Sequence, residues 1–226
     1  MLKRGASGEA YRPRFSILNP ALTQTLPPFQ TACGITDIIC HLYERYLTNT
    51  KNVETTDRLI EGLILSMINE GPKVIADPND YEARANIMWA GMVAHNNICG
   101  VGRTQDWCSH NVEHELSALY DCAHGAGLAV AMPAVFTYTM NHDVNRFAKI
   151  AVRVWGCQMD FENPERTAKA GIERLRPFMT PYPRPLVSFC FFRYTEKKSS
   201  TKELSQNEQT NCDSFRYPRR SPQGGY

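Results

Sequence analysis

The sequence contains no apolar run that approaches the roughly 18 residues needed to cross a membrane as a helix. It also has no large excess of charge of one sign, because its 226 residues carry a formal net charge of +2. A nucleic-acid-binding protein needs a clustered basic face, so this balance argues against that class of partner. The basic N-terminal residues are not followed by an apolar stretch, and we therefore expect no secretory signal. The sequence thus predicts neither a membrane nor a nucleic acid as a partner.

Paired cysteines and glycine-rich loops are also missing. The eight cysteines include no C-x-x-C pair, so we expect reduced thiols and a cytoplasmic protein. No glycine-rich loop of the kind that cradles phosphate appears in the chain. The G-A-G run at residues 125–127 follows no predicted strand, so it does not fit the dinucleotide-binding pattern. Its small residues would instead let a helix or a ligand approach closely.

Helical periodicity is the pattern that the sequence has in abundance. Hydrophobic residues make up 42% of the chain, which is enough for a core, and many recur at three- and four-residue spacing. We therefore predict an all-α fold class. The predicted helices cover residues 30–46, 54–75, 80–98, 107–122, 125–140, 143–157 and 163–178.

Several local features qualify this helical series. Residues 15–18 are predicted to form a short strand within an extended N-terminal segment. Thr55 or Thr56 is a candidate cap for the second helix, and Pro72 is expected to interrupt or kink that helix. The last part of the chain is rich in Lys, Ser, Thr, Gln and Asn without periodicity, so residues 193–226 are predicted to be disordered.

The first chemical motif is a carboxylate and an imidazole four residues apart, Asp37 and His41. On a helix these positions share a face, so both side chains can reach one ion. Most such pairs are ordinary contacts on a helix surface. Here the predicted helix is apolar and follows a Pro-Pro start, which places the pair in a buried setting. A buried carboxylate needs a partner, and a metal ion is one such partner.

The second motif is a group of three histidines, His110, His114 and His124. His110 and His114 are four residues apart, so each can be interpreted as a metal ligand or as a hydrogen-bonded core residue. Together with the earlier Asp/His pair, the three histidines favour one mixed site. Oxygen and imidazole donors suit a borderline ion such as Fe²⁺ or Zn²⁺. His95 and His142 have no other candidate ligand near them in the sequence, and we favour a structural role for both.

Two longer segments resemble the iron-containing (group III) alcohol dehydrogenase family, in its butanol-dehydrogenase-like branch. The first runs from NPALTQTLP to GITDIICHLYE, residues 19–44. The second runs from DWCSHNVEHELSA to HGAG, residues 106–127. The segments occur in the family's order, and the resemblance covers about residues 13–180. Asn19 departs from the family, which more often has an acidic residue at that position.

The resemblance, carried over position by position, implies roles for individual residues. Four residues would be the metal ligands: Asp37, His41, His110 and His124. His114 would not be a ligand but a catalytic residue near the nicotinamide and the substrate, where it would relay a proton or orient the substrate. Leu22 and Thr25 match a loop that lies close to the cofactor in the family.

The resemblance also implies a fold and a domain organisation. The fold would be the helical metal-binding domain of a dehydroquinate-synthase-like, iron alcohol dehydrogenase fold. Residues 1–26 would be a remnant of the nucleotide-binding domain and its linker, and residues 27–180 the helical catalytic domain. Residues 181–226 would be a disordered tail outside the family. We hypothesise that a frameshift, mis-splicing or an error in the gene prediction explains this change in sequence.

The implied activity is hydride transfer between NAD(P) and a primary alcohol or aldehyde, with butanol-like substrates and Fe²⁺ (or Zn²⁺) as the metal. The family's nucleotide-binding residues lie mostly outside the matched segments, so we expect a fragment with little activity alone. Two other functions stay open. One is a non-catalytic metal-binding helical remnant or partner-binding module, and the other is a metal-dependent hydrolase with an activated water. Exposed apolar surface would favour self-association into a homo-oligomer.

Overall fold

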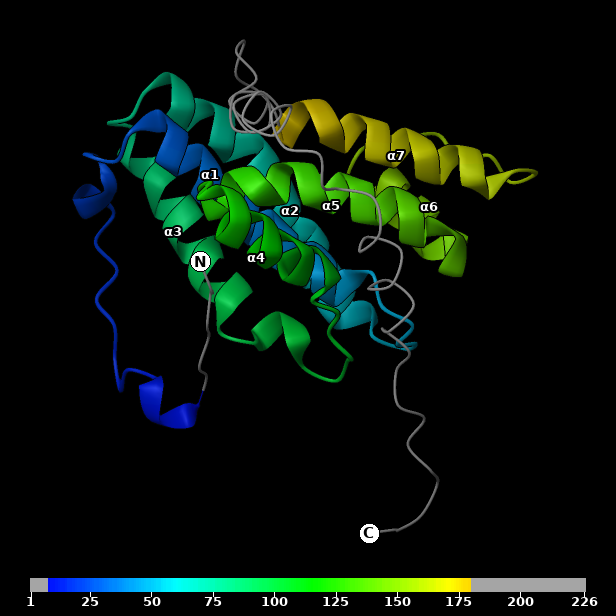
Figure 1. Ribbon diagram of the computed structural model, residues 1–226, viewed down its shortest axis with the longest axis horizontal. Helices are drawn as coiled ribbons and strands as arrows, with labels where there is room; N and C mark the ends of the chain where they lie inside the picture. The colour runs from blue at the N-terminus through cyan, green and yellow to red at the C-terminus, as the bar shows by residue number, and fades with distance from the viewer. Residues whose placement is uncertain (1–7, 180–226) are drawn as a thin grey trace, which may run out of the picture. The chain divides into compact units, whose positions relative to one another are not determined.

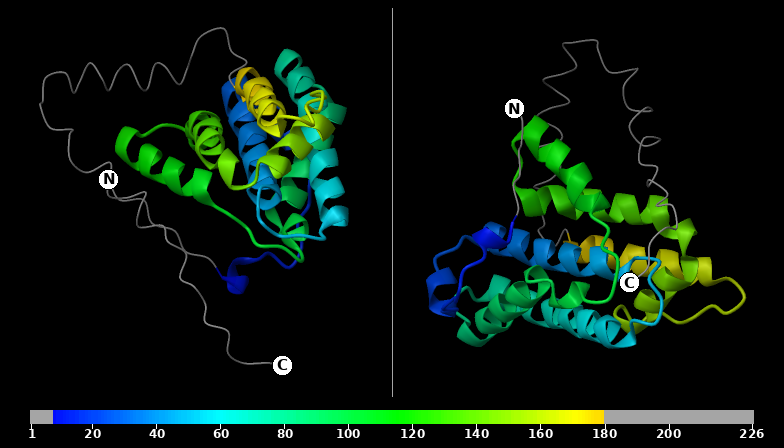
Figure 2. Two further views of the ribbon diagram at one scale, coloured as in Figure 1. Left: turned by 90° about the vertical axis from the view of Figure 1, so that its right-hand side faces the viewer. Right: turned by 90° about the horizontal axis from the view of Figure 1, so that it is seen from below.

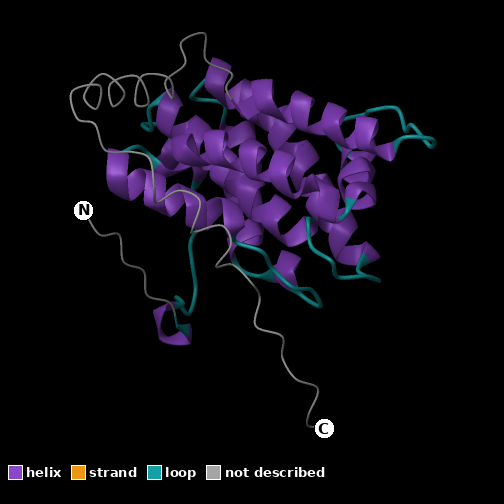
Figure 3. Ribbon diagram, turned by 45° about the vertical axis from the view of Figure 1, so that its right-hand side comes forward, coloured by secondary structure: helices purple, strands orange, loops and turns teal. Residues whose placement is uncertain are grey.

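The computed structural model describes residues 8–179, and helices are the only regular secondary structure within them (Figure 3). This confirms the predicted all-α fold class. The predicted tail, residues 181–226, lies outside the described residues. The α-helices are α1 (Pro28–Tyr46), α2 (Glu54–Ala76), α3 (Tyr81–His95), α4 (Cys108–Tyr120), α5 (His124–Thr139), α6 (Val144–Arg153) and α7 (Pro164–Met179). Short 3-10 helices are η1 (Glu9–Tyr11), η2 (Pro20–Thr23), η3 (Ile98–Gly100) and η4 (Met140–His142).

Helix α1 lies at the centre of the bundle, where it packs against α2, α3, α4 and α5 (Figure 1, Figure 2). Its sequence explains this position, because most of its residues are buried. Ile39, Leu42 and Tyr46 have no exposed surface. Burial of a large apolar side chain contributes about 1.5–3 kcal/mol, so these contacts fix the helix from several directions. None of the described helices is both long and apolar enough to span a membrane.

Helices α6 and α7 form a close pair, and α7 also packs on α5. The two helices of the pair touch at Gly171, where an added Cβ atom would lie 2.5 Å from the Cβ atom of Ala151. Ile172 and Leu175 continue this buried face of α7. The buried residues of this pair belong to the same hydrophobic core as those of α1, α2, α3 and α5.

The predicted strand over residues 15–18 is wrong. The segment has no regular structure, and the side chains of Phe15 and Ile17 are 80% and 84% exposed. A lone strand leaves its backbone groups unpaired, and the rest of the described chain contains no strand edge to pair with. Asn19 instead accepts a hydrogen bond that caps the 3-10 helix η2.

Two predictions about α2 are also wrong. The N-cap position belongs to Val53, and the side chains of Thr55 and Thr56 do not cap the helix. The hydroxyl of Thr56 donates to the Val53 carbonyl instead. The predicted interruption at Pro72 does not occur, because α2 runs without a break from Glu54 to Ala76, and the alternative of a kink at this proline stays a prediction.

Three helices end earlier than predicted: the one predicted over 143–157 ends at Arg153, and two others end at residues with left-handed backbone. The helix predicted over 80–98 ends at His95, shortly before Asn97 with its φ of 73°. The helix predicted over 107–122 ends just before Asp121, which has a φ of 53°. Asn and Asp tolerate this conformation better than other residues with a Cβ atom, and it cannot continue a right-handed helix.

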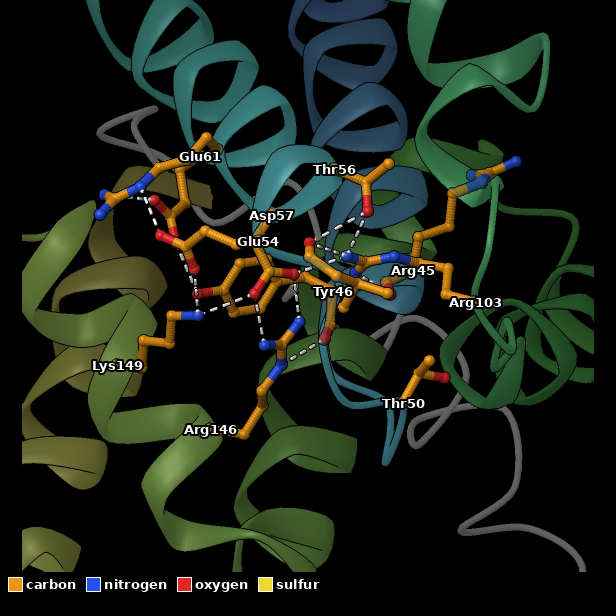
Figure 4. Close-up of polar contacts among 12 residues, drawn as sticks. Arg45, Tyr46, Thr50, Glu54, Thr56, Asp57, Glu61, Arg103, Arg146 and Lys149 are labelled. Carbon is orange, nitrogen blue, oxygen red and sulfur yellow. Dashed lines mark hydrogen bonds and ion pairs between the residues drawn. The ribbon is translucent and has the colours of Figure 1, made fainter.

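A buried ionic network around Asp57 ties α1, α2 and α6 together (Figure 4). The Asp57 carboxylate is 1% exposed and accepts hydrogen bonds from Arg103 at 2.6 Å and from Lys149 at 2.8 Å. Arg146 donates to both oxygens of the same carboxylate. Its Nε atom also donates to the carbonyl of Tyr46, at 2.8 Å, where α1 ends. The network therefore anchors the C-terminal end of the central helix.

The cations of this network determine the ionisation of Asp57. Burial by itself would raise the pKa of Asp57, but hydrogen bonds from Arg146, Lys149 and Arg103 outweigh it and hold that pKa well below its ordinary value. Because the pKa is lower in the folded state than in the unfolded chain, the ionised carboxylate stabilises the fold above about pH 4. This contribution is lost as the pH falls toward the folded-state pKa.

Replacement of Asp57 by alanine should lower the free energy of unfolding by about 3–5 kcal/mol, because three cations lose their shared buried partner. Urea denaturation followed by circular dichroism measures this change. The control is Glu173→Ala, which removes an exposed carboxylate of α7 and should change the free energy by less than about 0.5 kcal/mol. Equal changes in the two variants would contradict the anchoring role of Asp57.

Candidate metal centre

Asp37 and His41 lie on one face of the central helix α1, one turn apart. The Nε2 atom of His41 is 3.7 Å from Oδ1 of Asp37. Both side chains are partly buried, with exposed fractions of 17% for His41 and 24% for Asp37. The spacing of the first motif therefore places a carboxylate and an imidazole side by side at the edge of the core.

Helices α4 and α5 bring two further imidazoles to the same carboxylate. The Nε2 atom of His110 lies 3.2 Å from Oδ1 of Asp37, and the Nε2 atom of His124 lies 3.4 Å from it. His110 belongs to the first turn of α4, and His124 is the first residue of α5. The structure thus gathers around one oxygen atom all the residues that the resemblance implies as metal ligands.

Two buried carboxylates hold the far nitrogens of these imidazoles. The Nδ1 atom of His110 makes a short contact with Glu44, and the Nδ1 atom of His124 makes one with Glu113. Glu44 is 3% exposed and Glu113 is fully buried. A carboxylate that accepts the Nδ1 hydrogen fixes the ring and turns the Nε2 lone pair forward, as carboxylates behind metal-bound histidines do. Sequence reasoning missed both glutamates.

His41 is held differently from the other two imidazoles. Its Nδ1 atom lies 3.3 Å from Nη1 of Arg45, which also donates to the His41 carbonyl at 2.9 Å. An arginine can only donate, so Nδ1 of His41 accepts in this arrangement and the ring hydrogen sits on Nε2. Metal binding through Nε2 would therefore require Arg45 to release Nδ1.

Burial and the close contacts among these side chains shift their pKa values and so determine their charges. Burial by itself would raise the pKa of Asp37, but hydrogen bonds from His110 and His124 are among the contacts that hold it well below its ordinary value. Burial lowers the pKa of His41 to about 3, so this ring is neutral at pH 7. Burial would also lower the pKa of His110, but hydrogen bonds to Asp37 and Glu44 raise it to about 9. A metal that binds here would have to displace the His110 proton.

Glycines at the start of α5 allow the helices to approach one another at the site. A Cβ atom at Gly125 would lie 2.2 Å from the backbone oxygen of Cys33 in α1. A Cβ atom at Gly127 would lie 2.7 Å from the side chain of Glu113. The G-A-G run therefore has the close-approach role that its small residues suggest, and it makes room for the carboxylate behind His124.

The other predicted site residues lie around this cluster. The ring of His114 has its centroid 5.3 Å from that of His124 and 6.2 Å from that of His110. It is therefore a neighbour of the cluster, one turn along α4. Leu22 and Thr25 are exposed in the segment that leads into α1. Their predicted contact with a cofactor stays a prediction.

Sequence reasoning assigned His95 to a structural role, but the structure places it in this cluster. It is the last residue of α3, and its Nε2 atom lies 3.2 Å from Oδ2 of Asp37. Its ring centroid is 4.0 Å from that of His41. The sequence carries no spacing that would reveal this contact, because His95 reaches the site only through the packing of α3 on α1.

The donor atoms fit a borderline divalent ion. Ligand atoms of Asp37, His110 and His124 all lie within 4.8 Å of one another, and the same holds for Asp37, His41 and His95. Carboxylate and imidazole donors in this mixture suit Fe²⁺ and Zn²⁺. A cation among them would also compensate the buried carboxylates.

Comparisons with known proteins match this part of the chain. The model of the Fe-containing alcohol dehydrogenase family, C-terminal, matches residues 31–183. NADH-dependent butanol dehydrogenase B of Clostridium acetobutylicum is 42% identical over 167 residues, which are 74% of this chain and 43% of that protein. NADPH-dependent aldehyde reductase YqhD of Escherichia coli is 38% identical over 144 residues, which are 64% of this chain and 37% of that protein.

The fold is also similar to solved structures. NADH-dependent butanol dehydrogenase A from Thermotoga maritima has a TM-score of 0.74 and 36% identity, over 77% of this chain and 43% of that one. The chain therefore spans less than half the length of these relatives. The matched region contains Asp37, His41, His110 and His124.

The contact of Gly125 with α1 can be tested with a control glycine at which an added Cβ atom would contact no other atom. Gly125→Ala should lower the free energy of unfolding by about 1–3 kcal/mol, because the added methyl group overlaps backbone atoms that cannot move aside. Gly62→Ala, at an exposed position of α2 with no atom within 4 Å, should raise it by about 0.5–1 kcal/mol. Thermal and urea denaturation of both variants measure the difference. Stabilisation by both substitutions would contradict the close approach.

Proposed function

Because the chain belongs to the Fe-containing alcohol dehydrogenase family, we propose that residues 27–180 form the metal-binding catalytic domain of an NAD(P)-dependent alcohol dehydrogenase or aldehyde reductase. The observation that carries this proposal is the convergence of imidazole nitrogens from α1, α4 and α5 on one oxygen of Asp37. Buried carboxylates behind two of these imidazoles support it, because such partners orient a histidine toward a metal ion.

The proposed metal ligands are Asp37, His41, His110 and His124, and the proposed ion is Fe²⁺ (or Zn²⁺). When bound, such an ion polarises the oxygen of an alcohol or of a carbonyl group. Glu44 and Glu113 keep two of the imidazoles aimed at the ion by accepting their Nδ1 hydrogens. The proposal includes a small movement of Arg45 away from His41 Nδ1, so that this ring can present a free Nε2.

The proposed reaction is hydride transfer between NAD(P) and a primary alcohol or aldehyde, with butanol-like substrates. Relatives described as NADH-dependent butanol dehydrogenases and as an NADPH-dependent aldehyde reductase support this substrate class. In the oxidative direction, the alcohol carbon gives a hydride to the nicotinamide and the hydroxyl group gives up a proton. The products are an aldehyde and NAD(P)H. We assign the relay of that proton to His114, because its ring lies beside that of His124.

The parts of the chain outside the helical domain have proposed roles of their own. Residues 1–26 would join it to a nucleotide-binding domain, and residues 181–226 would lie outside the family's fold. Leu22 and Thr25 would contact the nicotinamide from the segment before α1, where both are exposed. We propose a cytoplasmic location, which buried free thiols such as that of Cys99 support, and association into a homo-oligomer.

The metal site can be tested on the purified chain. We expect one Fe²⁺ or Zn²⁺ ion per chain, and loss of that ion in His124→Ala. The affinity should fall by more than the roughly 10–100-fold that loss of an outer partner costs, because a direct donor is removed. Mass spectrometry measures the metal content, and competition with a chromogenic chelator measures the affinity.

The matched control for this experiment is His142→Ala. His142 is an exposed histidine of η4, so its replacement should leave both the metal content and the affinity unchanged. Circular dichroism would establish that both variants are folded. Equal metal content in the wild type and in His124→Ala would contradict the proposed function.

A further inference from the structure

His95 is held with one ring nitrogen engaged and the other directed at the cluster. Its Nδ1 atom lies 2.7 Å from the carbonyl oxygen of Gly91, one turn back in α3. A carbonyl oxygen can only accept a hydrogen bond, so the hydrogen must sit on Nδ1 of His95. This contact fixes the ring and leaves Nε2 as the atom that faces the site.

The Nε2 atom of His95 approaches the side of the carboxylate that the other imidazoles leave free. It lies 3.2 Å from Oδ2 of Asp37, whereas His110 and His124 approach Oδ1. With the hydrogen on Nδ1, a neutral ring presents a lone pair at Nε2, and a carboxylate oxygen also presents lone pairs. Two such atoms repel each other unless a positive charge lies between them or on the ring. A metal ion supplies that charge without protonation of the ring.

We propose that His95 is a fifth protein ligand of the metal, bound through Nε2 on the Oδ2 side of Asp37. This inference rests on the proposed metal-dependent function and adds a residue to its ligand set. The ligand atoms of His95, Asp37 and His41 lie within 4.8 Å of one another, and those of Asp37, His110 and His124 form a second group of the same compactness that shares Asp37. The centroid of the His95 ring is also 4.0 Å from that of the His41 ring, and the two rings are tilted by 43°.

The backbone of α3 is arranged so that His95 can reach this position. A Cβ atom at Gly91 would lie 3.2 Å from Cδ1 of Ile38, so the glycine lets α3 come close to α1 next to Asp37. The carbonyl group of the same glycine receives the Nδ1 hydrogen of His95. Gly91 therefore has the role toward His95 that Glu113 has toward His124, since each accepts the hydrogen of the far nitrogen.

A fifth ligand has a consequence for the kind of ion. Four protein donors match the tetrahedral preference of zinc, and a substrate oxygen would then have to enter as a fifth donor. Five protein donors and one substrate oxygen make six, a number that suits an ion of octahedral preference. Four histidines lie close to Asp37, and among them the side chain of His95 is the most exposed, at 42%. It is therefore the histidine of this cluster that is most open to solvent.

Cobalt(II) is the probe for this proposal, because its visible absorption reports the number and type of its ligands. The wild type, His95→Ala and His95→Gln would be titrated with Co²⁺, with His142→Ala as the control. We expect the dissociation constant to rise at least about tenfold in His95→Ala, together with a changed visible spectrum. His95→Gln places an amide oxygen near the position of Nε2 and should recover part of the affinity.

The outcomes separate this inference from the proposed function. Unchanged affinity and an unchanged spectrum in His95→Ala, while His110→Ala loses the ion, would overturn the role of His95 and leave the proposed function standing. Failure of the wild type to bind Co²⁺ would overturn both. A loss in His95→Ala that His142→Ala shares would also count against a ligand role, because His142 lies outside the cluster.

Discussion

The carboxylate of Asp37 is the constraint on which the rest of the site depends. Imidazoles from α1, α3, α4 and α5 face its two oxygens at 3.2 to 3.7 Å. A partly buried carboxylate requires compensation, and so do the buried carboxylates of Glu44 and Glu113 behind two of those imidazoles. Protons on the histidines supply that compensation in part, and a divalent cation at the centre would supply it more completely. The positions of four helices are thus tied to the charge of one side chain.

The scaffold reaches this arrangement through close approach of its helices. Gly91 lets α3 come against Ile38, and Gly125 lets α5 come against the backbone of α1. At the other end of α1, the Asp57 network fixes α2 and α6 to the carbonyl of Tyr46. The central helix is therefore held near both ends, by small residues close to the cluster and by buried ion pairs far from it. Such a frame can hold several imidazoles in fixed orientations, which a metal site needs.

The sequence predicts the helices better than it predicts the site. Apolar spacing is a local property, so the α-helices of residues 28–179 follow from it, and the relation of Asp37 to His41 follows from helix geometry. The contact of His110 with Asp37 spans 73 residues, and no spacing in the sequence encodes it. The number of histidines in this part of the sequence favoured one mixed site, but only the family resemblance assigned His110 to the ligand set. His95 was missed because its contact, across 58 residues, depends on how α3 packs against α1. The strand expected at residues 15–18 failed because strand formation depends on a partner that a single segment cannot reveal.

We propose above all that the histidines around Asp37 bind a single metal ion. Anomalous diffraction from crystals of the chain loaded with Fe²⁺ or Zn²⁺, recorded at the absorption edge of the metal, tests it most directly. We predict one strong peak, at about 2.0–2.2 Å from a carboxylate oxygen of Asp37 and from imidazole nitrogens of His41, His110 and His124. A peak held instead by Glu113 and His114, or no peak near Asp37, would contradict it.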